Sequence, residues 1–313
     1  MTSDPGAPQP VLAVVDGIEV SGLLAPAPDP RGVLLALHGG GATSVYYDCP
    51  GHPELSLLRL AAANGFTVLA LDRPGYGATV PYADRLWEPQ SRVDLIYRAA
   101  EQVLAGRSRG AGTVLIAHSA GCELALRMAA DERGRDLLGV EVAGTGRLPT
   151  PEAQQAVWGR PAGTRPRGLY DLLWKPVELY PPDMVGGGPV RAEGHRLEAA
   201  TVNDWSEVEF PDLAGRIRIP VRFTLADHER VWRSDEEAFA QVAVAFTAAP
   251  RVVLNRQPGS GHNLSVGRSA RAYHLGVLAF AEECLIAAEQ VFDCPATQFD
   301  GAALDSAREA RPL

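Results

Sequence analysis

Short apolar runs alternate with segments of helical spacing along most of this chain, and this alternation restricts the fold more than any other feature of the sequence. Continuous apolar runs such as those at 32–37 and 66–71 are typical of strands that are covered on both faces. Segments with apolar residues three or four positions apart follow several of these runs, as expected for helices that cover a sheet. Strands are predicted at 11–15, 18–24, 32–37, 66–71, 113–117, 137–142, 219–225 and 251–254, and helices at 56–63, 92–104, 122–130, 235–246 and 270–290.

Repeated strand–helix units predict an α/β fold with a mostly parallel, doubly wound sheet and helices on both faces. The first two strands flank Asp16-Gly17, a dipeptide that is typical of a tight hairpin turn, so an antiparallel hairpin is expected at the N-terminal end. In sheets of this type, ligands bind at the carboxyl ends of the strands. We therefore expect functional residues in the loops that follow the strands.

The segment 145–215 interrupts the alternation. Prolines and glycines recur in it, and aromatic residues are interleaved between them. A length of 313 residues fits one α/β core with an insertion of this size. The sequence thus predicts a flexible N-terminus at 1–10, a core at 11–144 and 216–290, an insertion at 145–215, and a loosely held tail at 291–313.

Charge and composition exclude several classes of protein. The net charge is −9, and no basic stripe is present, which argues against nucleic acid as a partner. The first residues have neither the basic nor the apolar region of a signal peptide, and no run is long enough to cross a membrane, so a cytoplasmic protein is expected. The four cysteines match neither zinc-binding nor CxxC spacing, and no metal site is predicted.

The pentapeptide Ala117-His118-Ser119-Ala120-Gly121 lies between a predicted strand and a predicted helix. It differs from the pattern G-x-S-x-G only by an alanine at the first small position. Small residues are needed on both sides of the serine because the turn is tight. A serine that is exposed on such a strand-to-helix turn is a candidate nucleophile, and the N–H of Ala120 is a candidate donor to an oxyanion.

A serine nucleophile needs further groups, and the loops after other predicted strands contain candidates for each of them. The sequence His-Gly-Gly-Gly follows the strand at 32–37, and its glycines allow close approach to a substrate carbonyl. Gly40 is the first choice for the second oxyanion donor, with Gly39 and Gly41 as alternatives. A phosphate-binding loop or a plain turn is the other interpretation, although no nucleotide-binding pattern is present.

His262 is the candidate general base, because it follows the strand at 251–254 in a glycine-rich loop. The side chain of His118 is expected to point away from the site, and His274 lies inside a predicted helix, where a structural role is expected. The carboxylate that orients the base is ambiguous, because both Asp227 and Glu229 follow the strand at 219–225.

Together these motifs resemble the α/β-hydrolase superfamily, in which the order along the chain is serine, acid, histidine. The segment Asp72-Arg73-Pro74-Gly75-Tyr76-Gly77 is similar to the loop that follows the fourth strand in family members. That loop is typical of the fold and does not indicate a particular reaction. The resemblance covers residues 11–290 apart from 145–215, where family members insert a cap.

The resemblance implies a Ser-His-acid triad of Ser119, His262 and an acid, with the histidine late in the chain. Family members commonly have the acid three residues after a small residue, which is Ala226 here and favours Glu229, with Asp227 as the alternative. The strand-to-helix turn that carries the nucleophile is called the nucleophile elbow in this family. A serine at the elbow, where dehalogenases and epoxide hydrolases of the family have aspartate, implies acyl chemistry without a metal or organic cofactor. The aromatic residues of the cap become candidate pocket residues, with ordinary packing as the alternative: Trp158, Trp174, Tyr180 and Trp205.

The expected activity is that of a serine hydrolase, acting on a small, largely apolar carboxylic ester or thioester through an acyl-enzyme on Ser119. An acyltransferase or a cyclising thioesterase would have the same motifs, and a non-catalytic binding protein with this fold is a third alternative. The expected partner is a small acyl compound, with a thioester bound to a carrier protein left open. The sequence indicates no oligomeric state.

Overall fold

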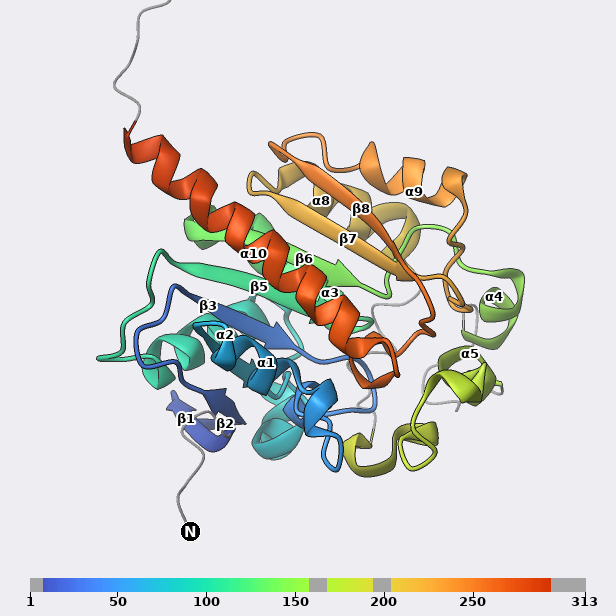
Figure 1. The fold of residues 1–313 in the computed structure, drawn as a ribbon, viewed down its shortest axis with the longest axis horizontal. Helices are drawn as coiled ribbons and strands as arrows, with labels where there is room; N and C mark the ends of the chain where they lie inside the picture. Colours follow the sequence, from blue (N-terminus) through green and yellow to red (C-terminus); the bar gives the residue numbers. More distant parts are fainter. Residues whose placement is uncertain (1–7, 158–167, 194–203, 294–313) are drawn as a thin grey trace, which may run out of the picture.

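The computed structural model describes residues 8–157, 168–193 and 204–293, and within them eight strands form one sheet (Figure 1). The strand order is β1-β2-β4-β3-β5-β6-β7-β8. Strand β2 pairs antiparallel with β1 and β4, and every other pairing is parallel. The strands are β1 (Gln9–Val15), β2 (Ile18–Ala25), β3 (Gly32–Leu37), β4 (Phe66–Leu71), β5 (Thr113–His118), β6 (Leu137–Ala143), β7 (Val221–Ala226) and β8 (Val252–Gln257). The predicted fold class, with its N-terminal hairpin, is confirmed.

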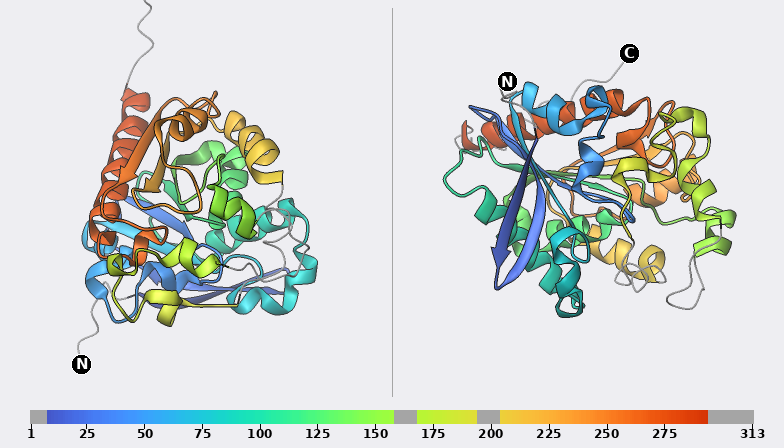
Figure 2. Two further views of the ribbon diagram at one scale, coloured as in Figure 1. Left: turned by 90° about the vertical axis from the view of Figure 1, so that its right-hand side faces the viewer. Right: turned by 90° about the horizontal axis from the view of Figure 1, so that it is seen from below.

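Helices cover both faces of the sheet (Figures 1 and 2). One face carries α1 and α10, whereas α2, α3, α8 and α9 contribute to the core on the other face. The α-helices are α1 (Leu57–Ala63), α2 (Pro89–Val103), α3 (Gly121–Ala130), α4 (Pro151–Val157), α5 (Leu169–Trp174), α8 (Phe210–Arg216), α9 (Glu236–Ala243) and α10 (Ala270–Asp293). Shorter helical turns are η1 (Ser44–Tyr47), η2 (Pro53–Leu55), η3 (Gly77–Arg85), η4 (Glu132–Asp136), η5 (Val177–Leu179), η6 (Val185–Val190), η8 (Leu264–Val266) and the π-helical η7 (Trp205–Glu209).

The two cores explain why central strands such as β3 and β5 are apolar along most of their length. On β5, Leu115 and Ala117 belong to the core beneath α3, whereas Val114 and Ile116 belong to the core beneath α10. All four side chains are buried. Because successive side chains of a strand point to opposite faces, a strand covered on both faces is mostly apolar along its length.

The segment predicted as a cap contains helices in different surroundings. In Figure 1, α4 and α5 lie on the side toward which the parallel strands point, beside the loops that carry the predicted site. Its last helix, α8, packs against α3, and Phe210, Leu213 and Ala214 enter the core beneath the sheet. Part of the segment therefore serves as one of the helices that cover the sheet.

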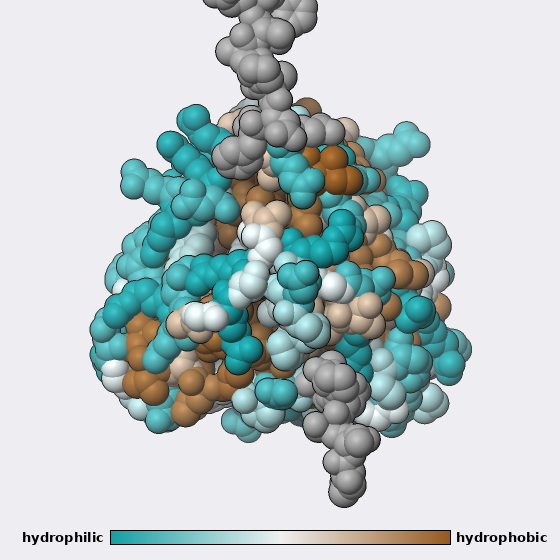
Figure 3. All heavy atoms as spheres, turned by 60° about the vertical axis from the view of Figure 1, so that its left-hand side comes forward, coloured by the Kyte–Doolittle hydropathy of each residue, from teal (hydrophilic) through white to brown (hydrophobic). Residues whose placement is uncertain are grey.

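The outer surface has apolar residues in several places (brown in Figure 3), interspersed with hydrophilic ones (teal). The edge strand β1 contributes two of the exposed large side chains, Leu12 and Val14. The backbone N–H of Val14 donates to Gln102 Oε1 on α2, so a side chain satisfies this donor of the edge strand. Within the described residues, no helix is long and apolar enough to cross a membrane.

Candidate active site

Ser119 lies on the turn between β5 and α3 in a backbone conformation that residues with a side chain rarely adopt. Its φ is +51°, and its N–H donates to the carbonyl of Ala143 at 2.8 Å. A non-glycine residue held at positive φ stores backbone strain, and such strain is common at functional sites. The turn presents the hydroxyl group above the carboxyl end of the sheet, as predicted for this motif.

The two small residues of the pentapeptide have different reasons for their size. A Cβ atom at Gly121 would lie 2.5 Å from the carbonyl oxygen of His38 and 2.6 Å from that of Leu37, which leaves no room for any side chain. Ala117 is fully buried and its methyl group packs into the core beneath α3. Alanine at the first small position is therefore compatible with the turn, whereas the last position requires glycine.

Three side chains from separate loops form a hydrogen-bonded row at this end of the sheet. Ser119 Oγ lies 3.0 Å from His262 Nε2, and His262 Nδ1 lies 2.8 and 3.0 Å from the two carboxylate oxygens of Glu229. A carboxylate only accepts hydrogen bonds, so Nδ1 of the neutral imidazole carries the hydrogen and Nε2 is free to accept from the serine. The row can pass a proton from the serine hydroxyl to the imidazole.

The structure brings Glu229, and not Asp227, to the candidate base. Oε1 of Glu229 also accepts from the N–H groups of Arg230 and Val231, at 3.0 and 2.9 Å. The Asp227 carboxylate instead accepts from the N–H groups of Gly259 and Ser260, at 2.8 and 2.9 Å. Asp227 thus fastens the loop that leads to His262, which is a supporting contact that the sequence did not reveal.

The glycines after β3 lie beside the serine. A Cβ atom at Gly39 would be 3.2 Å from Ser119 Cβ, so this loop passes directly over the elbow. The N–H of Gly41 donates to the hydroxyl of Tyr76 at 3.0 Å, which occupies it and favours Gly40 or Gly39 as the second oxyanion donor. Ala120 precedes the first residue of α3, where backbone N–H groups have no partner inside the helix. Its N–H is therefore placed to serve as the other donor.

The loop after β4 holds the glycine loop in place, a role that the motif alone did not predict. The N–H of Arg73 donates to His38 Nε2 at 3.0 Å, and the N–H of Ser44 donates to Asp72 Oδ1 at 2.7 Å. With the contact of Tyr76, three residues of this loop fix the loop after β3. Burial, with the Arg73 charge as a second cause, holds the pKa of His38 well below its usual value, so its ring stays neutral.

His118 does not point away from the site, so the expectation for its side chain was wrong. Its Nε2 lies 2.8 Å from the carbonyl oxygen of His262, and the centroids of the two rings are 5.1 Å apart. His118 is the last residue of β5, and its buried side chain reaches the backbone of the His262 loop. The sequence could not predict this contact, because His118 and His262 are 144 residues apart.

The predicted pocket aromatics that can be described are buried, and their contacts are with other parts of the protein. The hydroxyl of Tyr180 accepts from the N–H of Asn263, next to His262, and the Trp174 ring packs against Tyr180 edge to face. The Trp205 indole donates to Thr145 Oγ1 and packs against Phe210. Trp158 lies outside the described residues. Tyr180 thus lies against the His262 loop and Trp174 packs on Tyr180, whereas Trp205 packs into the core.

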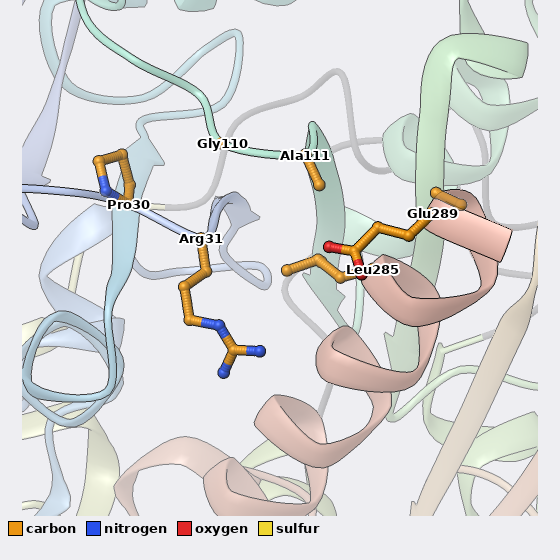
Figure 4. A pocket seen from close by; sticks show the side chains of 7 residues that line it. Pro30, Arg31, Gly110, Ala111, Leu285 and Glu289 are labelled. Atoms are coloured by element: carbon orange, nitrogen blue, oxygen red, sulfur yellow. The ribbon is translucent and has the colours of Figure 1, made fainter. Parts of the chain in front are cut away.

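A surface pocket of about 400 Å³ lies at the opposite, amino-terminal ends of the strands. Figure 4 shows Pro30 and Arg31 on one side of it and Leu285 and Glu289 on the other. Its lining includes no serine, cysteine or histidine, and it is separate from the row of Ser119, His262 and Glu229. Among the described residues, no group of three or more His, Cys, Asp or Glu side chains is arranged to hold a metal ion.

Comparisons with known proteins agree with this fold. The sequence model described as "Alpha/beta hydrolase family" matches residues 33–273. ABHD14A of Danio rerio is 42% identical over 72 residues, which are 23% of this chain and 24% of that protein. The chain thus matches about a quarter of the length of this curated relative.

Two solved structures illustrate the likeness. A thermostable carboxyl esterase from Bacillus coagulans aligns with a TM-score of 0.65 at 20% identity, covering 89% of this chain and 99% of the esterase. A lipase in an open form aligns with a TM-score of 0.65 at 17% identity, covering 89% of this chain and 99% of the lipase. At such identities the alignments establish a shared fold.

Proposed function

Because the chain belongs to the alpha/beta hydrolase family, as its motifs predicted, we propose that it is a serine hydrolase that cleaves a carboxylic ester or thioester through an acyl-enzyme on Ser119. One observation carries the proposal: the continuous hydrogen-bonded row from the Ser119 hydroxyl through His262 to Glu229. The strained turn at Ser119 supports it, because non-glycine residues held at positive φ cluster at functional sites.

In the first half of the reaction, Ser119 Oγ attacks the carbonyl carbon of the substrate and His262 Nε2 takes the hydroxyl proton. Nδ1–H stays hydrogen-bonded to Glu229, whose negative charge stabilises the imidazolium. The carbonyl oxygen gains negative charge and accepts hydrogen bonds from the N–H groups of Ala120 and Gly40. The tetrahedral intermediate then collapses, and His262 gives the proton to the departing alcohol or thiol.

In the second half, a water molecule attacks the acyl carbon and His262 Nε2 takes one of its protons. Collapse of this intermediate breaks the bond to Ser119 Oγ, which recovers its proton from His262, and the carboxylic acid leaves. Acyl transfer differs only in the second nucleophile, an alcohol or amine in place of water. The two reactions therefore share every residue of the site and differ in the product.

The proposed substrate is small and largely apolar. Its support is the aromatic character of the segment 145–215, of which Tyr180 is buried against the loop that carries His262 and Trp174 packs on Tyr180. The serine at the strand-to-helix turn supports ester or thioester chemistry, because a serine hydroxyl that is activated by a neighbouring base can attack such a carbonyl carbon.

The test combines active-site labelling with turnover. A fluorophosphonate probe should label the wild-type protein and not Ser119→Ala, and the wild type should hydrolyse p-nitrophenyl butyrate and butyryl thioesters. Circular dichroism should show that both proteins are folded. A folded wild type that is neither labelled nor active on any acyl compound would sink the proposal and favour a binding role. Ester products that form with an added alcohol, without free acid, would indicate a transferase instead.

A further inference from the structure

We propose that His118 is a positioning residue, whose imidazole holds His262 at the serine by fixing the backbone of the His262 loop. This inference rests on the proposed acyl-transfer chemistry, because it concerns how the general base of that reaction is held. His118 itself does not touch the reacting atoms. It acts on the carbonyl group of His262, at a distance of 2.8 Å from its own Nε2.

The contact assigns the hydrogens of the His118 ring. A carbonyl oxygen only accepts, so Nε2 of His118 must carry the hydrogen and donate it. Burial, with the neighbouring His262 as a second cause, lowers the pKa of His118 to about 3, so the ring is a neutral donor wherever the enzyme is folded near neutral pH. Within the described residues its Nδ1 is buried and has no hydrogen-bond partner, so the contact with His262 is the ring's one hydrogen bond there.

The surroundings of His118 are shaped to seat this ring. It stacks on Tyr46, with centroids 4.9 Å apart and planes at 18°. Glycines from two other loops make room for it: a Cβ atom at Gly39 would lie 2.8 Å from its Nδ1, and one at Gly144 would lie 3.1 Å from its Nε2. The ring therefore has little room to turn, and its Nε2 faces the carbonyl of His262.

The His262 loop needs an external hold. It follows Gly259 and Gly261, and glycine restricts the backbone less than any other residue. Three aromatic rings from three parts of the chain contact its backbone. The His118 ring donates to the carbonyl of His262, the Tyr180 hydroxyl accepts from the N–H of Asn263, and the Tyr46 hydroxyl accepts from the N–H of Ser265.

Among the three rings, His118 makes the contact nearest to the base. It bonds to the peptide group of His262 itself, whereas the tyrosines bond to residues one and three positions later. It also lies next to Ser119 in the chain, so a single turn sets the position of the nucleophile and of the group that holds the base. Moving a catalytic group by about 1 Å can cost up to about 100-fold in rate.

The experiment compares substitutions that keep or remove the donor. His118→Phe keeps an aromatic ring of similar size and removes the hydrogen-bond donor, whereas His118→Gln places an amide N–H₂ near the position of Nε2. His274→Phe is the matched control. His274 is also fully buried, burial lowers its pKa to about 3, and within the described residues neither of its ring nitrogens has a hydrogen-bond partner. Each variant is assayed for kcat, KM, the rate of fluorophosphonate labelling and the melting temperature.

We expect kcat and the labelling rate of His118→Phe to fall by about 10- to 100-fold with KM nearly unchanged, because the contact positions the base and not the substrate. His118→Gln should recover most of the loss, and His274→Phe should keep the wild-type kcat. If His118→Phe does not fold, His118→Asn replaces it, since its shorter amide does not reach the carbonyl of His262.

Two outcomes would overturn the positioning role in an active wild-type enzyme. One is a kcat for the donor-less variant within twofold of wild type. The other is an equal loss in His118→Gln and in the donor-less variant, which would indicate packing alone. Failure of the proposed function is a distinct result, because then the wild type itself would neither be labelled nor turn over acyl substrates.

Discussion

Glu229 is the residue on which the proposed chemistry depends most after the serine and the histidine. Its side chain is fully buried against His262, and one of its carboxylate oxygens accepts three hydrogen bonds, from the His262 ring and two backbone N–H groups. These contacts fix the carboxylate, and the carboxylate in turn fixes the hydrogen of His262 on Nδ1. The tautomer with a free Nε2 is the one that can accept the serine proton.

We predict that Glu229→Gln lowers kcat by about 1,000- to 10,000-fold, because an amide can donate to Nδ1 and favour the wrong imidazole tautomer. The amide has nearly the same shape, so the melting temperature should change little. Asp227→Asn is the control, and it should keep kcat within about tenfold. The assay is ester turnover under saturating substrate. A larger loss for Asp227→Asn than for Glu229→Gln would reverse the assignment of the acid.

The sequence predicted the residues whose proposed role follows from a local pattern. Ser119 and Gly121 belong to one pentapeptide, and the fixed spacing after Ala226 favoured Glu229 over Asp227. The roles of His118 and Asp227 depend on residues 144 and 32 or 33 positions away. The pattern of apolar residues in a sequence does not predict which distant backbone carbonyl or N–H group a side chain will hydrogen-bond to. These contacts are therefore visible only in the folded chain.

Strands β6 and β7 carry a buried ion pair between the sheet and α10. Glu141 Oε1 lies 3.0 Å from Arg222 Nη1 and accepts a hydrogen bond from the hydroxyl of Tyr273 on α10. Both charged side chains are almost fully buried. Removing one partner of such a pair leaves an uncompensated charge in the core, which costs more than the pair itself contributes.

We predict that Arg222→Met destabilises the protein by about 3–5 kcal/mol at pH 8 and by less at pH 5. Burial raises the pKa of Glu141, and the charge of Arg222 opposes this, so the pKa rises further without Arg222. A raised carboxyl pKa means that the folded state binds a proton more tightly than the unfolded chain. Stability then falls as pH rises from the ordinary carboxyl pKa through the folded value. Urea unfolding at both pH values measures the difference.

The double variant Glu141→Gln with Arg222→Met is the control, because it removes the titrating group. The destabilisation of this double variant relative to wild type should not increase between pH 5 and pH 8. An Arg222→Met variant whose cost is the same at both pH values would show that Glu141 stays charged, or that solvent reaches it.

All eight strands were predicted from the sequence, with ends that differ by no more than three residues. The central strands β3 and β4 were predictable because burial on both faces makes nearly their whole length apolar, whereas β1 and β2 were recognised from the hairpin turn between them. The segment 145–215 was not resolved into elements by its sequence, since short helices such as α4 and α5 offer too few turns for a periodic pattern. Helix α8 is an example: the prediction placed its residues in the insertion, but the helix packs against α3.

In the molecule as a whole, the candidate site joins loops from both halves of the core with the segment 145–215. That segment reaches the glycine loop directly. The N–H of Ala192 donates to the carbonyl oxygen of Gly41 at 2.8 Å, and Ala42 and Arg191 form an isolated bridge. The N–H of Gly41 meanwhile donates to Tyr76, so the glycine next to the candidate oxyanion donor Gly40 is held from two sides. The position of the segment 191–192 should therefore influence the oxyanion donors.

We predict that Ala192→Pro lowers kcat by about 3- to 10-fold, because proline has no N–H to donate to Gly41. The substitution suits the backbone before it, since Arg191 has φ −68° and ψ 133°, a conformation that residues before proline favour. Loss of one backbone hydrogen bond costs about 1 kcal/mol, so the melting temperature should fall by only about 2 °C. Ester turnover and thermal unfolding are measured on the same preparations.

Ala192→Ser is the matched control, because it changes the side chain at the same position and keeps the N–H. It should retain the wild-type kcat. If the proline and serine variants turn over equally fast, the glycine loop is held by Tyr76 and the loop after β4 alone. A lower kcat for the proline variant with little change in its melting temperature would mean that the contact tunes the oxyanion donors without supporting the fold. The segment 145–215 would then influence the rate through the glycine loop as well as through any contact with substrate.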